Sequence, residues 1–213
     1  MEKADTKKKI LEKALELFAE NGYDAVSVGE IARAVGIKAP SLYSHYPSKQ
    51  AIFDAIVEET ARQYEKYTDG INIHVQDAQK DTVVFSGITE EFLVKKVRRI
   101  FLYSLHDKAI SRFRRMMTIE QFRSEKLSAF YTERYVGRMV GYHAAIFKNL
   151  IAAGEIKNEN PETLAMLYVA PIITLLGVCD RQPECEEECI KKLEEHVRLF
   201  YRTFNTLKQA DTD

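Results

Sequence analysis

Residues 27–49 decide the fold, and they read SVGEIARAVGIKAPSLYSHYPSK. Ser27 and Glu30 stand three positions apart, as in a capping box, where a hydroxyl and a carboxylate satisfy amide groups at the start of a helix. Gly36 permits a tight turn after barely two helical turns, because glycine adopts positive φ without steric cost. Pro40 fits the first turn of another short helix. The stretch therefore predicts two short helices joined by a tight turn.

Longer helices are predicted on both sides of this pair. Apolar residues between positions 10 and 18 recur at intervals of three and four, and Asn21 and Gly22 are typical of a helix end. Ser48 is placed to cap a fourth helix over residues 48–66. A first helix that braces two short helices is the arrangement of a helix-turn-helix, whose second short helix has the right diameter for the major groove of DNA.

A series of residues along this region matches a known pattern. They are Phe18, Gly22 and Tyr23, Ser27 and Val28, Ile31 and Ala32, Gly36 and Ile37, Ser41 to Tyr43, His45 and Tyr46, and Ser48 and Lys49. From residue 5 to about residue 60 the sequence resembles the DNA-binding region of TetR-type (TetR/AcrR) transcriptional regulators. The resemblance implies a regulator, expected to be a repressor, that a small molecule releases from a palindromic DNA operator.

The resemblance also implies which side chains meet DNA. The expected contacts are Ser27, Lys38, Ala39, Ser41, Tyr43, His45 and Lys49. Hydroxyl groups, an ammonium and the N–H groups of a helix start all suit phosphate oxygens. Lys38 and Ala39 depart from the family pattern, which often has a capping hydroxyl and a larger polar side chain there. A cation is unfavourable at a helix start, so we expect DNA phosphate to neutralise Lys38.

The rest of the chain is predicted to be helical, because apolar residues recur at three and four and only five prolines and nine glycines interrupt them. Further helices are expected at about 90–106, 109–122, 124–152, 161–180 and 184–207, and a loop at 69–87. The sequence thus predicts an all-α fold of nine helices. A helix-turn-helix domain would span residues 1–47 and a ligand-binding and dimerisation domain residues 48–213, with helix 48–66 as the connector.

An aromatic and methionine set is the candidate lining of the effector cavity, although core packing also explains any single member. It comprises Phe92, Tyr103, Met116, Met117, Phe122, Tyr131, Tyr135, His143 and Phe147. An effector there would tilt the fourth helix and change the spacing of the two DNA-binding helices. Gly137 and Gly141 are interpreted as permitting close helix packing, with a bend or room for ligand as alternatives.

Residues 164–178 are apolar all round, so a helix there must be covered on two sides, by its own domain and by a second copy of the chain. The resemblance places the last two helices in a four-helix dimer interface. The expected interface residues are Leu167, Pro171, Leu175, Leu193, Val197, Phe200 and Phe204. A fully packed monomer is the alternative.

The bulk properties favour a cytoplasmic protein without membrane contact. A formal net charge of -1 means that any DNA contact depends on locally placed lysines and arginines. The amino terminus lacks the pattern of a signal peptide. The apolar stretch is about 15 residues long, against roughly 20 for a membrane span. The three cysteines do not resemble a disulfide framework.

Other classes of function remain as alternatives. No HExxH, GxSxG, P-loop or dinucleotide-binding motif occurs, so we expect neither catalysis nor a cofactor. A helical protein-interaction module without DNA binding is one alternative. A redox- or metal-sensing regulator is another, since Cys185 and Cys189 lie one helical turn apart and His196 follows, although neighbouring glutamates disfavour the thiolate.

Overall fold

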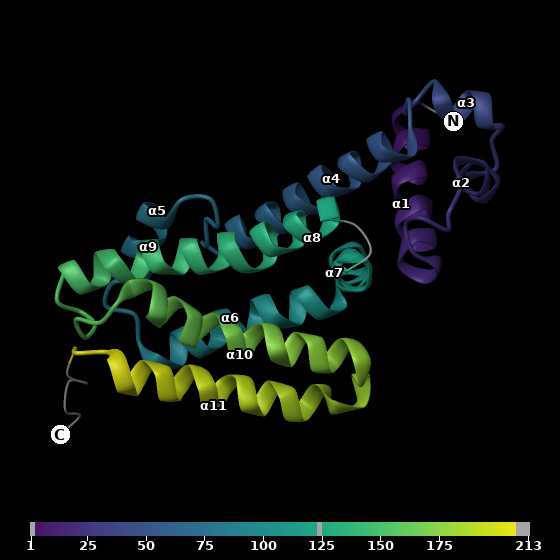
Figure 1. Ribbon diagram of the computed structural model, residues 1–213. Helices are drawn as coiled ribbons and strands as arrows, with labels where there is room; N and C mark the ends of the chain where they lie inside the picture. The colour runs from purple at the N-terminus through teal and green to yellow at the C-terminus, as the bar shows by residue number, and fades with distance from the viewer. Residues whose placement is uncertain (1–2, 123–124, 208–213) are drawn as a thin grey trace. The chain divides into compact units, whose positions relative to one another are not determined.

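The computed structural model describes residues 3–122 and 125–207, except for the side chains of residues 3, 4, 126, 134 and 135. This part of the chain forms eleven α-helices and no extended strand, apart from an isolated bridge between Ile156 and Asn205 (Figure 1). The helices are α1 (Lys3–Asn21), α2 (Val28–Val35), α3 (Ala39–Tyr43), α4 (Lys49–Asp69), α5 (Ala78–Phe85), α6 (Glu90–His106), α7 (Lys108–Glu120), α8 (Glu125–Tyr131), α9 (Arg138–Ala152), α10 (Pro161–Arg181) and α11 (Glu186–Phe204). The predicted all-α fold is confirmed.

Two helices were not predicted. α5 lies inside the expected loop at 69–87, where Asp77 caps it by accepting a hydrogen bond from the Lys80 amide at 3.0 Å. The helix expected at 124–152 is divided into α8 and α9 by a π-helical segment, Thr132–Gly137. The polar and glycine residues of 69–87 indicated a loop, although one of them, Asp77, caps a helix.

The chain folds into two compact units. The first unit contains the residues up to Tyr64 together with Asp107–Tyr131, and the second contains Glu65–His106 together with the residues from Thr132 onward. The predicted division after residue 47 separates the helix-turn-helix alone, whereas the compact first unit also includes α7, α8 and most of α4. The DNA-binding candidates therefore belong to a larger body than the sequence suggested.

An aromatic series forms part of the interior of the first unit. Phe18 contacts Tyr23 with ring centroids 5.1 Å apart, and Tyr23 contacts Phe53 at 5.2 Å. Phe53 in turn lies 6.5 Å from both Phe113 and Phe130. These rings come from α1, the following loop, α4, α7 and α8. Aromatic pairs at such distances add to the stability that burial provides, so these contacts help to hold the first unit together.

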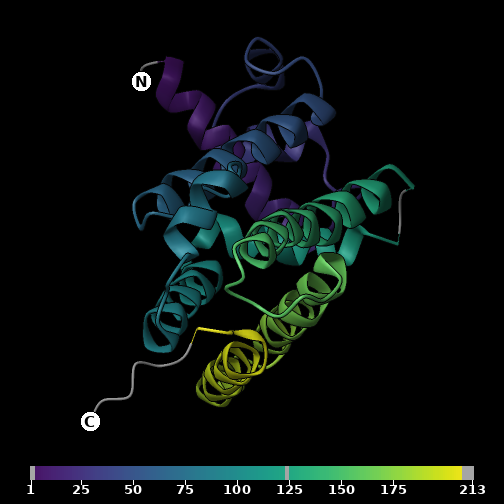
Figure 2. The ribbon, with the colours of Figure 1, turned by 90° about the vertical axis from the view of Figure 1, so that its left-hand side faces the viewer.

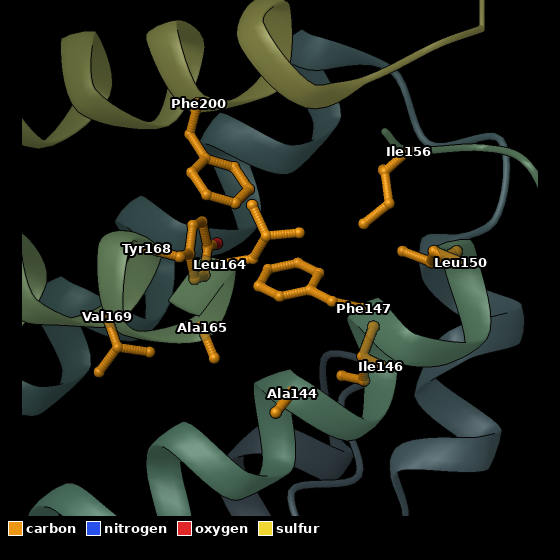
Figure 3. Close-up of a cluster of buried hydrophobic side chains, with 10 residues drawn as sticks. All are labelled: Ala144, Ile146, Phe147, Leu150, Ile156, Leu164, Ala165, Tyr168, Val169 and Phe200. Atoms are coloured by element: carbon orange, nitrogen blue, oxygen red, sulfur yellow. The ribbon is translucent and has the colours of Figure 1, made fainter. Parts of the chain in front are cut away.

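The second unit contains a layer of three antiparallel helices, α9, α10 and α11, which follow one another along the chain (Figure 1; Figure 2). α6 contacts both α10 and α11, and α5 contacts α9. The side chains between the three helices form a buried cluster that includes Phe147, Leu164, Tyr168 and Phe200 (Figure 3). This cluster forms one part of the core of the second unit, and smaller clusters that include Phe101 and Val94 form other parts.

α10 is longer than the apolar stretch that the sequence indicated to be too short for a membrane span. The helix has 21 residues, close to the predicted 161–180, whereas its apolar stretch alone is about 15 residues long. By length and composition alone the whole helix could cross a membrane. Only 28% of its most apolar window is buried within the chain. Apolar residues such as Met166 and Leu167 remain about half exposed. The helix therefore has an apolar face that its own unit does not cover.

Two glycines have different roles from those expected. A Cβ added to Gly141 would meet no atom within 4 Å, so the interpretation that it permits close helix packing is wrong. Gly137 ends the π-helical segment, and such segments accompany irregular helix geometry, which agrees with the alternative of a bend. Gly36 is in the left-handed region at φ 82°, where other residues are strained.

Gly36 has a positive φ and Gly141 faces open space, so substitution by alanine should have opposite effects at the two positions. Gly36→Ala should lower the free energy of unfolding by about 1 kcal/mol, because alanine is strained at positive φ. Gly141→Ala should raise it by about 0.5–1 kcal/mol, because alanine favours a helix and the space is open. Urea denaturation followed by circular dichroism measures both. A neutral Gly36→Ala variant would contradict the turn described for α2.

Candidate nucleic-acid interface

The start of α2 is fixed by the predicted capping box. The Ser27 amide donates to Oε2 of Glu30 at 2.7 Å, and the Glu30 amide donates to Oγ of Ser27 at 3.2 Å. The hydrogen bond from the Ser27 backbone is the main reason that the pKa of Glu30 is lowered. The exchange satisfies two amides that would otherwise lack partners, so α2 begins at Val28 as the sequence predicted.

The end of α2 turns the chain sharply. The Gly36 amide donates to the carbonyls of Ala32 and Arg33 at 3.0 and 3.1 Å, and the Ile37 amide donates to the Ala32 carbonyl at 3.0 Å. This is the pattern of a Schellman end, which needs a residue at positive φ. The turn places Lys38 at the start of α3.

α3 has one buried side and one open side. Leu42 has no exposed surface, which contributes about 1.5–3 kcal/mol of hydrophobic stabilisation. Ser41 and Ser44 are exposed, and Tyr43 is 51% exposed. Five residues are too few for a stable isolated helix, so packing through Leu42 holds this one in place. The open side is a polar and aromatic surface.

The expected DNA contacts divide into two groups by exposure. Ser27, Lys38, Ser41 and Tyr43 are exposed, whereas Ala39, His45 and Lys49 are half-buried. The Lys38 side chain makes no capping hydrogen bond, so its charge remains at the start of α3 as predicted. Nδ1 of His45 is buried and has no hydrogen-bond partner within the described residues.

Lys49 is already engaged within the first unit. Its Nζ donates to the carbonyls of Tyr23 and Asp24 at 2.9 and 3.3 Å, and it lies 4.4 Å from the centre of the Tyr23 ring. These contacts tie the start of α4 to the loop before α2. Lys49 therefore has a structural role that the sequence did not indicate.

α7 supports the same loop and α1 through ionisable groups. The Tyr23 amide donates to Oε1 of Glu120 at 3.1 Å, and Glu120 is wholly buried. Nη2 of Arg112 donates to Oε1 of Glu16 at 2.9 Å. Sequence reasoning missed both contacts, because residues about a hundred positions apart give no local signal. The helix-turn-helix is thus fixed to α7 as well as to its own neighbours.

A cavity of about 70 Å³ lies in the second unit. Its lining residues are Phe85, Ile88, Leu93, His143, Ile146, Phe147, Leu150, Glu155, Ile156, Tyr168, Phe200, Tyr201, Phe204 and Asn205. Of the nine predicted lining residues, His143 and Phe147 line it. Tyr168 and Phe200 are prominent members that were not predicted as lining; Phe200 had been expected at the dimer interface instead.

The other candidates do not line this cavity. Met116 and Met117 are wholly buried residues of the first unit, and Phe92 and Phe122 are 52% and 88% exposed. Tyr103 stacks on Tyr67 with ring centroids 3.6 Å apart, Tyr131 is half-buried, and the side chain of Tyr135 lies outside the described residues. Spacing along one helix does not reveal which unit the helix joins, which explains why the sequence grouped residues that lie apart.

The residues predicted at the dimer interface differ in how far they are exposed. Leu193, Val197 and Phe200 are buried within their own unit, which contradicts their expected place at an interface, whereas Phe204 lines the cavity and is half-buried. On α10, Leu167 is 52% exposed, and Pro171 and Leu175 are half-buried. Met166 and Leu199, which were not among the predicted residues, are 50% and 67% exposed. A helix that is apolar all round does not show which of its faces points outward.

The positions of the cysteines differ from those that a redox- or metal-sensing regulator would need. Cys189 is buried in a cluster with Cys179, while Cys185 is half-buried and contacts Oε1 of Gln182 at 3.7 Å. Burial raises the pKa of the Cys179 thiol to about 12, which disfavours the reactive thiolate. Among the described residues, no group of three or more His, Cys, Asp or Glu side chains could hold a metal ion.

The capped α2, the glycine turn and the half-exposed α3 define a helix-turn-helix protein of the all-α class. Comparison with known proteins gives the family. The family described as bacterial regulatory proteins, tetR family, matches residues 10–56. Over this region the chain therefore matches the TetR family, in agreement with the resemblance found in the sequence.

Relatives match either this region or the whole chain. IcaR of Staphylococcus aureus, named as an HTH-type negative transcriptional regulator of the biofilm operon icaADBC, is 44% identical over 52 residues, which are 24% of this chain and 28% of IcaR. YttP of Bacillus subtilis, named as a probable HTH-type transcriptional regulator, is 25% identical over 207 residues, which are 95% of this chain and 89% of YttP. The match to IcaR thus spans little more than a quarter of that protein.

Solved structures share the fold. SmeT of Stenotrophomonas maltophilia, solved as a complex with triclosan, has a TM-score of 0.69 and 17% identity, and the match covers 97% of this chain and 93% of SmeT. At this identity the likeness establishes the fold and no more.

The engagement of Lys49 leads to a test with a matched control. Lys49→Met should lower the free energy of unfolding by about 1 kcal/mol, because two carbonyls lose a charged donor. Lys38→Met removes the same charge from an exposed side chain without a capping bond and should have an effect within ~0.5 kcal/mol. Equal losses of stability, measured by urea denaturation, would contradict the role assigned to Lys49.

Proposed function

We propose that this chain is a dimeric DNA-binding transcriptional repressor that a small molecule releases from a palindromic operator. The observation that carries the proposal is the open side of α3, where Ser41 and Tyr43 are exposed while Leu42 anchors the helix from behind. A short helix presented in this way fits the major groove. The naming of IcaR as a negative transcriptional regulator supports repression.

The proposed contacts follow from exposure and chemistry. Lys38 and Tyr43 meet phosphate or base edges from α3, and Ser41 lies between them in sequence. The Ser27 end of α2 presents N–H groups toward a phosphate, as helix starts do. Lys49 acts mainly by positioning the loop before α2. DNA phosphate would offset the unfavourable position of the Lys38 charge.

The proposed dimer forms through the outer faces of α10 and α11. Leu167 on α10 and Leu199 on α11 are exposed apolar residues, and the two helices are in contact. Exposed apolar surface of this kind commonly marks a protein interface. Two copies related by a two-fold axis would present two α3 helices to successive major grooves, roughly 34 Å apart.

The proposed effector site is the cavity of the second unit. Its walls include the inner faces of α10 and α11, whose outer faces belong to the proposed dimer interface. A small molecule there would release DNA only if it prefers the released state. A full switch requires about 5 kcal/mol of differential affinity. The complex of SmeT with triclosan supports a small-molecule effector.

The DNA proposal predicts effects on affinity and on its salt dependence. Lys38→Ala should weaken binding to a duplex that the wild-type protein selects from a random-sequence pool, and should reduce the slope of log affinity against log salt by about one. Tyr43→Ala should weaken binding by roughly 5- to 30-fold, because it removes one or two contacts. Fluorescence anisotropy between about 50 and 200 mM salt measures both effects.

Lys80→Ala is the matched control, since it removes one exposed lysine charge from α5 in the second unit. It should leave the salt slope unchanged. If the Lys80 and Lys38 variants behave alike, or if wild-type binding does not depend on salt, the interface on α3 is wrong. The second outcome would favour a helical protein-interaction module.

The dimer proposal predicts that a charge in the apolar face separates the copies. Leu167→Glu and Leu199→Glu should shift sedimentation from dimer to monomer, because each would place a carboxylate in an apolar contact. Val83→Glu is the control, as Val83 is 76% exposed on α5 and lies on neither α10 nor α11. A wild-type monomer at all concentrations, or dimers of both α10 and α11 variants, would refute this interface.

A further inference from the structure

The cavity of the second unit has the features of a site for one chemical class. We propose that it binds an uncharged aromatic compound with a hydroxyl group, a phenol, whose hydroxyl is shared between His143 and Tyr168. This inference rests on the proposed effector function and specifies its ligand. The argument combines the walls, the hydrogen-bonding groups and the charge of the cavity.

Three aromatic rings in mutual contact are among the lining residues of the cavity. Phe147 and Phe200 are stacked with ring centroids 5.5 Å apart, and Tyr168 lies 5.7 Å from Phe147 and 5.0 Å from Phe200. These rings come from α9, α11 and α10 and point toward one another (Figure 3). A flat aromatic ligand is favoured by such walls, because ring pairs gain energy beyond area burial.

His143 offers a hydrogen-bond acceptor. Its Nδ1 lies 2.8 Å from the carbonyl oxygen of Met139, and a carbonyl only accepts, so Nδ1 carries the proton. Burial lowers the pKa of His143 to about 4, so the ring is neutral near pH 7 and Nε2 keeps its lone pair. The ring of His143 lies 5.2 Å from that of Tyr168. A ligand hydroxyl can therefore donate to Nε2.

Tyr168 offers the complementary donor. Burial raises the pKa of its hydroxyl, which stays protonated. Among the other polar groups of the lining, the Tyr201 hydroxyl donates to the Ile88 carbonyl at 3.0 Å, and Oδ1 of Asn205 accepts from the Leu207 amide at 2.8 Å. Within the described residues, neither Nε2 of His143 nor the Tyr168 hydroxyl makes a hydrogen bond. These two groups match a hydroxyl, which both donates and accepts.

The charge of the lining excludes an acid. The carboxylate of Glu155 is its charged group, and it accepts from the Ser86 hydroxyl and from the Gly87 amide at 2.8 Å. A carboxylate ligand would meet this negative charge without a cation among the lining residues. A cation would have to give up its hydration among walls that are mostly apolar. An uncharged ligand avoids both costs.

The size of the cavity connects binding to a change of shape. Its volume is about 70 Å³, roughly half that of an apolar cavity known to hold benzene, about 150 Å³. A ring enters only when lining side chains move, and Phe85 and Phe204 are half-buried members of the lining. A ligand that needs the wider cavity favours the state that contains it.

Calorimetric titration of the full chain with three probes tests the ligand class. The probes are para-propylphenol, propylbenzene and para-propylbenzoate, which differ in the polar group alone. We expect para-propylphenol to bind about 5- to 30-fold more tightly than propylbenzene, because it gains one or two hydrogen bonds. We expect para-propylbenzoate to bind at least about tenfold more weakly than para-propylphenol. Equal binding of the phenol and propylbenzene, or tightest binding of the benzoate, would overturn the proposal.

Variants test the two polar groups. Tyr168→Phe should weaken para-propylphenol binding about fivefold and leave propylbenzene binding unchanged, because only the hydroxyl is lost. Tyr103→Phe is the control outside the cavity and should change neither affinity. His143→Leu provides an independent test if the Tyr168 variant does not fold. Unchanged phenol affinity in folded variants of both residues would refute the proposed geometry.

The outcomes separate this inference from the proposed function. If para-propylphenol binds as expected but does not alter DNA affinity, the ligand class stands and effector release fails. If none of the three probes binds, the ligand class fails, and the anisotropy and sedimentation experiments still decide DNA binding and dimerisation.

Discussion

The burial of Leu42 is the contact on which the proposed DNA-binding surface depends. α3 has only five residues, so it gains little from its own helical hydrogen bonds. The residue at its N-cap, Lys38, makes no capping hydrogen bond through its side chain. The position of the helix comes from one buried side chain and from the glycine turn before it. The rigid surroundings matter as much: Tyr23, Glu120 and Lys49 tie the preceding loop to α7 and α4.

The predictions that succeeded rest on local chemistry. Ser27 with Glu30, and Gly36 after two helical turns, determine backbone geometry within a few residues, so sequence alone was sufficient. The predictions that failed concern distant contacts. Met116 is buried in the first unit, whereas Phe200 faces the cavity of the second, and neither location follows from helical spacing. α5 was missed because Asp77 suits a loop and a helix cap equally.

α10 and α11 link the proposed activities of the second unit. Tyr168 faces the cavity while its neighbour Leu167 is exposed, and Phe200 faces the cavity while Leu199 is exposed. A ligand that moves the inner side chains therefore acts on helices whose outer faces would join two copies. Such coupling would change the spacing of the two α3 helices through the dimer, a route that differs from the tilt of the fourth helix expected from the sequence.

Hydroxyl-radical footprinting on a duplex selected by the wild-type protein tests the central claim most directly. If the open side of α3 enters the major groove in a two-fold dimer, the cleavage pattern will show two symmetric protected regions about 34 Å apart from centre to centre. A single asymmetric region, or protection that persists when Tyr43 and Lys38 are both replaced by alanine, would contradict the account.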